Sequence, residues 1–192
     1  TVIVVTGLIG RYGTDALAGY GLGARLELML VPLSFGIGAA LTAAVGANFG
    51  AKQYARARRI AWAGSAVTLF VTGVIGCTVA VAPGLWLDMF TSEPGPYGYG
   101  ATYLSIAGPF YALLGAGQAL YFASQGTGRV LMPVIASGIR FFAVVGLGGL
   151  GVALGWEVSG IFWVVSLGLI LIGIGQALCL FTRAWRPDTG VS

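Results

Sequence analysis

Long uncharged stretches are the feature that most restricts what this chain can fold into. Four stretches of at least 24 residues contain no Asp, Glu, Lys or Arg, and they cover residues 28–51, 60–87, 94–128 and 158–182. A fifth stretch, 130–156, is interrupted only by Arg140. An α-helix needs about 20 apolar residues to cross the hydrocarbon core of a bilayer. Each stretch is therefore long enough to span a membrane.

The composition excludes several classes of protein. Only 8% of the 192 residues are charged and 57% are apolar, whereas an ordinary soluble domain carries about 25% charged residues. The ten Lys and Arg residues, set against six Asp and Glu, are too few to form a basic surface for nucleic acid. The chain has no His, which removes His-dependent nucleophilic catalysis and most zinc sites. We expect an integral membrane protein that is not an enzyme and has no metal, cofactor or nucleic-acid partner.

The uncharged stretches are continuously apolar and do not alternate, which indicates α-helices and not the strands of a barrel. Residues 1–10 form an apolar segment about half as long as a membrane span. We interpret this segment as the end of a further helix and expect the chain to be a fragment of a longer protein. The predicted fold is an all-α membrane bundle with five full transmembrane helices, at about 16–46, 58–88, 99–125, 130–154 and 157–182.

The basic residues fall on one side of the predicted bundle. The connections on that side and the C-terminal segment carry seven of them: Lys52, Arg56, Arg58, Arg59, Arg129, Arg183 and Arg186. The connections on the other side carry only Arg11. Because Lys and Arg accumulate in cytoplasmic loops, this distribution predicts a multi-pass protein of the cell inner (plasma) membrane with a cytoplasmic C-terminus.

Three ionisable residues lie inside the predicted spans: Arg25, Glu27 and Arg140. Counted along the predicted helices, Glu27 and Arg140 both lie about 15 Å from a membrane surface. A charge at that depth costs about 2.5–3.5 kcal/mol, so each needs a partner or a wet cavity. Arg25 and Glu27 point about 200° apart on a helix and do not pair, and Arg25 is shallow enough to extend outward.

Two interpretations of Glu27 follow from this depth. In the first, Glu27 is a proton or cation site whose occupancy changes the preferred conformation of a transporter. In the second, Glu27 forms a static ion pair with Arg140 that holds two helices together. The sequence leaves both open.

Polar and aromatic side chains recur on the predicted helix 99–125. Tyr103, Tyr111, Gln118 and Tyr121 follow one another at steps of eight, seven and three residues, which keeps most of them on one face. Such a face can line a cavity for flat, cationic organic molecules. The alternative is ordinary packing between helices, with hydroxyl hydrogen bonds. Tyr111 and Gln118 therefore join Glu27, Arg25 and Arg140 as candidates for substrate or cation binding.

Glycine and proline add two expectations about the helices. Small residues four apart, as in Gly19–Gly23 and Gly46–Gly50, predict close packing between helices. A smooth, Gly-rich helix can also bend or slide during transport. Pro32 and Pro133 lie inside predicted spans, where each is expected to remove one backbone hydrogen bond.

Two motifs resemble those of a known family. The segment VGANFGAKQYARA, residues 45–57, is similar to a Gly-(Gln/Asn)-x-x-Gly-Ala segment followed by basic residues in MATE (multidrug and toxic compound extrusion) transporters. The turn SQGTGR, residues 124–129, followed by Pro133, is similar to the Gly-x-Gly turn between the tenth and eleventh helices of that family. The resemblance covers essentially the whole chain, as the end of helix 7 followed by helices 8 to 12.

The resemblance implies a fold and a function. MATE transporters have two six-helix lobes that face each other across a central cavity, and this chain resembles the C-terminal lobe. The implied function is secondary active efflux of drugs or metabolites by alternating access, in exchange for H⁺ or Na⁺. The implied partners are small organic cationic substrates, the lipid bilayer and an N-terminal lobe that is missing from this chain.

This chain departs from the family pattern in its acidic residues. One bacterial branch uses acids on helices 7 and 10 of this lobe, but residues 1–10 and 99–125 contain none. Another branch places its coupling acid in the N-terminal lobe, and the Arg-x-Glu segment that ends at Glu27 is similar to that branch. The resemblance thus implies a main coupling site outside this chain and an accessory role for Glu27. The alternatives are a lipid-linked oligosaccharide flippase of the same superfamily and an inactive isolated half.

Overall fold

A computed structural model of the chain describes residues 1–182 and residue 185. This described part contains helices and no strand, and the predicted all-α fold class is confirmed. Arg183, Arg186 and the C-terminus predicted to be cytoplasmic lie outside the described residues. The elements in chain order are α1 (Val2–Ile9), η1 (Gly10–Tyr12), α2 (Thr14–Gly50), α3 (Tyr54–Val81), α4 (Gly84–Leu87), α5 (Pro94–Ala107), η2 (Gly108–Phe110), α6 (Tyr111–Gly126), α7 (Leu131–Ala153) and α8 (Val158–Cys179).

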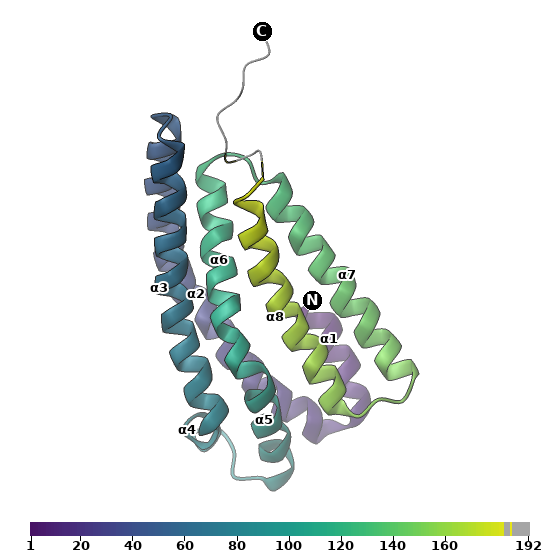
Figure 1. The fold of residues 1–192 in the computed structure, drawn as a ribbon. Coiled ribbons are helices and arrows are strands. Elements are labelled where there is room, and N and C mark those ends of the chain that lie inside the picture. Colours follow the sequence, from purple (N-terminus) through teal and green to yellow (C-terminus); the bar gives the residue numbers. More distant parts are fainter. Residues whose placement is uncertain (183–184, 186–192) are drawn as a thin grey trace.

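The α5–η2–α6 segment lies at the centre of the bundle. The helices α2, α3 and α8 pack directly against it, and α7 packs against the far side of α8. The short helix α1 contacts both α2 and α7, and Figure 1 shows it behind α8 in the half of the bundle where α2 begins. Within the described residues, five helices, counting α5–α6 as one, are long and apolar enough to cross a membrane.

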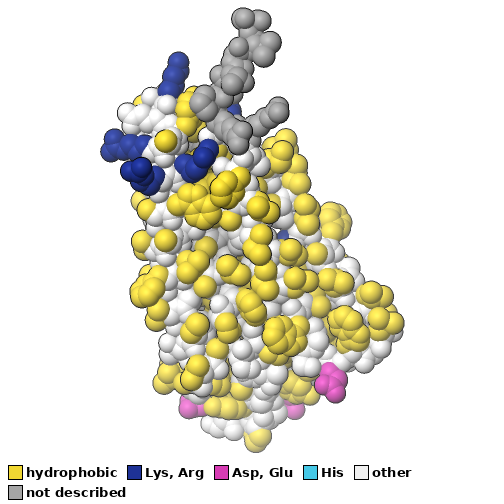
Figure 2. Space-filling model, viewed as in Figure 1, with side chains coloured by type: hydrophobic (Ala, Val, Ile, Leu, Met, Phe, Trp, Pro, Cys, Tyr) yellow, Lys and Arg dark blue, Asp and Glu magenta, His cyan; other side chains and the backbone are white. Residues whose placement is uncertain are grey.

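Charged side chains gather at the two ends of the bundle. The basic end carries Lys52, Arg56, Arg58, Arg59 and Arg129, next to the ends of α2 and α6. Figure 2 shows Lys and Arg side chains at this end and Asp and Glu side chains at the opposite one. The opposite end, called the acidic end, carries Asp15, Asp88, Glu93 and Glu157. These residues lie near the start of α2, in the connection from α4 to α5 and just before α8.

Two helices differ from the spans predicted for them. The span predicted at 58–88 is divided, because Pro83 disfavours the helical conformation for the residue before it; Ala82 has φ −129° and ψ 71°, and α3 ends at Val81. The span predicted at 99–125 is divided by η2, which contains Pro109. Proline has no amide hydrogen and crowds the preceding turn, so α5 and α6 are separate helices.

The two prolines singled out in the sequence have different effects. Pro32 lies in the interior of α2, where it removes one helical hydrogen bond as expected. The expectation for Pro133 is wrong, because Pro133 lies in the first turn of α7, which begins at Leu131. Amide groups in a first turn have no partner within the helix, so no bond is lost there.

Glycines allow α2 and α3 to approach the central segment closely. A Cβ atom on Gly23 of α2 would meet the ring of Tyr103, and one on Gly76 of α3 would meet the carbonyl oxygen of Gly108. By contrast, Gly21 and Gly50 on α2 have open space at the corresponding position. The close packing predicted for small residues therefore holds at Gly23 but not at Gly50.

Candidate functional site

Glu27 lies in the middle of the bundle and not at either charged end. At about 1.5 Å per residue along α2, Glu27 is about 20 Å from Thr14 at the acidic end of the helix. Its carboxylate points towards α5, where the hydroxyl of Tyr103 donates a 2.9 Å hydrogen bond to Oε2. A carboxylate within the membrane thus has a direct hydrogen-bond donor on the neighbouring helix.

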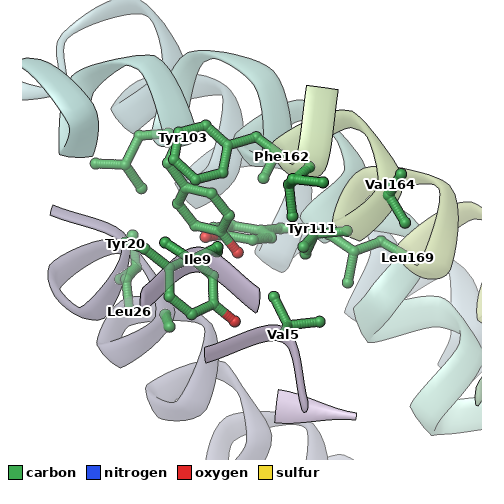
Figure 3. Close-up of a cluster of buried hydrophobic side chains, with 14 of the residues drawn as sticks. Val5, Ile9, Tyr20, Leu26, Tyr103, Tyr111, Phe162, Val164 and Leu169 are labelled. Atoms are coloured by element: carbon green, nitrogen blue, oxygen red, sulfur yellow. The ribbon is translucent and has the colours of Figure 1, made fainter. Parts of the chain in front are cut away.

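Two aromatic rings pack against Tyr103, the donor of this hydrogen bond. Tyr20 meets Tyr103 edge to face, with 5.2 Å between ring centroids, and Phe162 meets it at 5.3 Å. Figure 3 shows the rings of Tyr20, Tyr103 and Phe162 together in the buried cluster. All three side chains are almost completely buried. The rings come from α2, α5 and α8, so the surroundings of Glu27 depend on how these three helices pack.

Tyr111 belongs to the same buried cluster, but it does not contact Glu27 through a hydrogen bond. Its hydroxyl is 3.4 Å from the carbonyl oxygen of Gly23, one turn before Glu27 on α2. Tyr111 is completely buried. Tyr111 thus joins α6 to α2 immediately after the break at η2.

Arg140 lies near this cluster without a direct ion pair. Glu27, Tyr103 and Tyr20 all interact electrostatically with its guanidinium, yet no nitrogen of Arg140 lies within 4.0 Å of a Glu27 carboxylate oxygen. The Nε atom of Arg140 is buried and makes no hydrogen bond. The static ion pair considered from the sequence is therefore absent from this conformation. Arg140 contributes a positive potential to a site that contains one carboxylate.

Arg25 is directed away from Glu27. Its guanidinium lies over the ring of Phe90, 5.3 Å from the ring centroid, and the side chain is exposed. Phe90 belongs to the connection between α4 and α5 at the acidic end. Arg25 thus extends towards the membrane surface, as its shallow position indicated, and the structure does not bring it together with the other candidates.

Gln118 lies in a separate place, nearer the basic end. Gln118 and Tyr121 of α6 line a pocket of about 240 Å³ together with Ser137 of α7. The remaining lining residues are Val31, Phe122 and Ile172. The Oε1 atom of Gln118 is buried without a hydrogen-bond partner. The pocket walls are thus mainly apolar, and the unpaired Gln118 oxygen lies buried beside them.

The residues expected on one face between Tyr103 and Tyr121 do not line one common cavity in the structure. Tyr103 and Tyr111 are completely buried in the central cluster, whereas Gln118 and Tyr121 line the pocket. The 3₁₀ turn at η2 is not the cause, because Tyr111, Gln118 and Tyr121 all follow it on α6. The separation reflects position along α6: Tyr111 lies at its start, and Gln118 and Tyr121 lie about two to three turns further on. The candidates divide into an acidic group around Glu27 and a polar pocket around Gln118.

Sequence reasoning missed Tyr20 and Phe162, the rings that complete the cluster. Tyr20 had a usable signal, since it precedes Glu27 by seven residues, or two helical turns, and so shares its face. Phe162 had none, because its contact with Tyr103 joins distant parts of the chain. The described residues contain no group of three His, Cys, Asp or Glu side chains that could hold a metal ion.

The family model named MatE matches residues 2–149. That range includes α1 to α6 and nearly all of α7, and so contains both Glu27 and Gln118. The chain belongs to the MatE family. As a MatE chain with five apolar helices of sufficient length, it is a multi-pass membrane protein.

Individual relatives of this MatE chain are longer than it is. Proteins named "Probable multidrug resistance protein NorM" in two strains of Xylella fastidiosa are 27% identical over 187 residues, which cover 96% of this chain and 38% of each relative. A MOP superfamily transporter from Pyrococcus furiosus has the same fold, with a TM-score of 0.81 and 16% identity. That match covers 95% of this chain and 40% of the transporter. The MatE chain thus spans about two fifths of these relatives, and the prediction of a transporter lobe is confirmed.

Proposed function

We propose that this chain forms one lobe of a secondary active transporter that exports small organic cations across the plasma membrane in exchange for H⁺ or Na⁺. The membership of the MatE family and the name of the NorM relatives support export of drugs. The transporter works by alternating access, with a second lobe that closes the substrate path. The basic end of the bundle faces the cytoplasm, in keeping with its Lys and Arg residues.

The observation that carries this proposal is the hydrogen bond from Tyr103 to Glu27 inside the membrane-spanning part of the bundle. A charged carboxylate at this depth is costly, and binding of H⁺ or Na⁺ neutralises it. Neutralisation weakens the charge-assisted bond from Tyr103 and the attraction to Arg140. Occupancy of Glu27 therefore changes the contacts between α2, α5 and α7, which is the differential interaction that a conformational shift requires.

The pocket at Gln118 is the proposed contact of this lobe with substrate. Its mainly apolar lining, with the aromatic ring of Tyr121 and the polar side chain of Gln118 in the wall, suits an organic cation. Glu27 acts on this pocket through helix packing and has no direct contact with it. A coupling site in the other lobe supplies the main driving ion, and Glu27 acts together with it.

The test uses the full-length transporter in proteoliposomes. Uptake of a cationic dye is followed under an imposed Na⁺ gradient and, separately, under an imposed pH gradient. Uptake driven by either gradient supports the proposal and identifies the coupling ion. If neither gradient drives uptake by folded protein, the antiport proposal is wrong, and lipid-linked substrates become the next candidates.

A pair of variants assigns the role of Glu27. Glu27→Gln removes the charge and keeps the shape, so gradient-driven uptake is expected to fall at least about fivefold while the amount of folded protein stays unchanged. Glu93→Gln makes the same exchange at an exposed position of the acidic end and is the matched control. Normal uptake by the Glu27→Gln variant contradicts the proposed role of Glu27 in transport. Loss of folded protein in this variant indicates that Glu27 has a structural role instead.

A further inference from the structure

The basic end of the bundle contains a second pocket, where α2 ends and α3 begins. It has a volume of about 540 Å³ and is lined by Lys52, Gln53, Tyr54, Ala55, Arg56, Arg58 and Trp185. Three of these side chains are cationic, and among the described residues every Asp and Glu lies elsewhere, at the acidic end or at Glu27. The pocket is therefore a concentrated positive site.

The first turn of α3 adds hydrogen-bond donors to this pocket. Gln53, the N-cap residue, makes no side-chain hydrogen bond to the turn. The first backbone bond of the helix runs from the amide of Ala57 to the carbonyl oxygen of Gln53. Within the described residues the amide groups of Tyr54, Ala55 and Arg56 have no backbone acceptor. A helix begun in this way favours an anion at its N-terminus.

The guanidinium of Arg58 is held in place beside the pocket. One terminal nitrogen, Nη2, donates a 3.0 Å hydrogen bond to the carbonyl oxygen of Trp185. The Nε atom is buried and has no hydrogen-bond partner. Arg58 is thus held in place at the wall of the pocket, and a guanidinium fixed in this way is suited to a phosphate oxygen.

The backbone at Lys52 is held in an unusual conformation for a lysine. The amide of Gln53 bonds to the carbonyl oxygen of Asn48 and that of Lys52 to Phe49, which is the Schellman pattern at a helix end. Lys52 occupies the position where glycine is usual, with φ +60°. A side chain there costs about 1–2 kcal/mol relative to glycine, so the lysine is a disadvantage to the turn itself.

We propose that this pocket binds the phosphate of an anionic phospholipid from the adjoining membrane leaflet. Lys52, Arg56 and Arg58 surround the phosphate, with the amide groups at the start of α3, while Tyr54 and Trp185 lie at the level of the headgroups. Aromatic side chains of this kind favour the membrane interface, and basic pockets beside transmembrane helices suit anionic headgroups. The site is independent of the substrate and the coupling ion of the transporter.

The experiment measures lipid binding to the full-length transporter in detergent by native mass spectrometry. Apparent Kd values are determined for dioleoyl phosphatidylglycerol and for the zwitterionic dioleoyl phosphatidylcholine. Lys52→Gly and Arg58→Gln are each expected to weaken phosphatidylglycerol binding about fivefold, the effect of one cation near a charged surface. Arg59→Gln removes the same charge from an exposed neighbour outside the pocket, and is expected to change the Kd less than about twofold.

Lys52→Gly separates loss of the site from loss of the fold. Glycine relieves the positive φ, so the unfolding temperature is expected to stay level or rise while lipid binding weakens. Equal binding of the two lipids, or equal Kd values for Lys52→Gly, Arg58→Gln and Arg59→Gln, overturns the proposal. Displacement of phosphatidylglycerol by excess inorganic phosphate also overturns it, because the pocket then takes a soluble anion.

Discussion

The hydroxyl of Tyr103 and the carboxylate of Glu27 are joined by a 2.9 Å hydrogen bond between α5 and α2. Tyr103 is completely buried, so water does not replace this donor when the bond is lost. The negative charge of Glu27 is therefore tied to the packing of an aromatic cluster that also contains Tyr20 and Phe162. Four predictions follow from this cluster and from the pocket at Gln118.

Tyr103→Phe removes the hydroxyl and keeps the ring. Hydrogen bonds to charged groups contribute about 1.5–3 kcal/mol, so the variant is expected to unfold at a lower temperature when Glu27 is charged. Thermal unfolding of the full-length transporter in detergent measures the effect. Tyr99→Phe, on the same helix, is the matched control. If Tyr103→Phe lowers the unfolding temperature as much in the Glu27→Gln variant as in the wild type, the hydrogen bond does not couple the two residues.

Gly23→Ala places a methyl group against the ring of Tyr103. Overpacking of a filled core costs about 1–3 kcal/mol, and displacement of the ring also weakens the bond to Glu27. We expect less folded protein and slower transport. Gly21→Ala, two residues earlier and with open space around its Cβ position, is expected to behave like the wild type. Equal behaviour of the two variants contradicts the close contact at Gly23.

Arg140→Gln tests whether Arg140 and Glu27 form a structural pair. Breaking a buried ion pair costs about 3–5 kcal/mol. Since no direct pair exists here, the free energy of unfolding is expected to fall by less than about 3 kcal/mol. Chemical unfolding of the full-length transporter gives the value, with Arg140→Lys as the variant that keeps the charge. A greater loss, or absence of folded protein, favours a pair that holds α2 and α7 together.

Gln118→Leu removes the amide group from the wall of the pocket that Tyr121 and Ser137 also line, and keeps a similar length. The half-saturating concentration of a cationic dye is expected to rise about fivefold, the effect of one neutral hydrogen bond, while the unfolding temperature stays the same. Gln125→Leu makes the same exchange at an exposed position of α6. An unchanged dye affinity in Gln118→Leu places substrate binding elsewhere.

The sequence predicted the features that depend on composition and local periodicity. Long uncharged stretches predicted five membrane-spanning helices. The position of Glu27 inside one of these helices predicted an acidic side chain deep in the membrane. The break at η2 was missed, because hydropathy does not register a single proline such as Pro109 within a long apolar span. The shallow position of Arg25 indicated its outward direction, and its guanidinium lies over Phe90. The direction of Arg140 and the contact between Phe162 and Tyr103 could not be predicted, because both depend on side chains of other helices.

The break at Gly108–Phe110 divides the central element of the bundle into two helical segments, α5 and α6. Tyr103 lies on α5 and Gln118 lies on α6, and both helices pack against α2. The buried cluster beside Glu27 therefore draws on both segments, because Tyr111 at the start of α6 packs in it together with Tyr103 of α5, whereas the Gln118 pocket draws on α6 and not on α5.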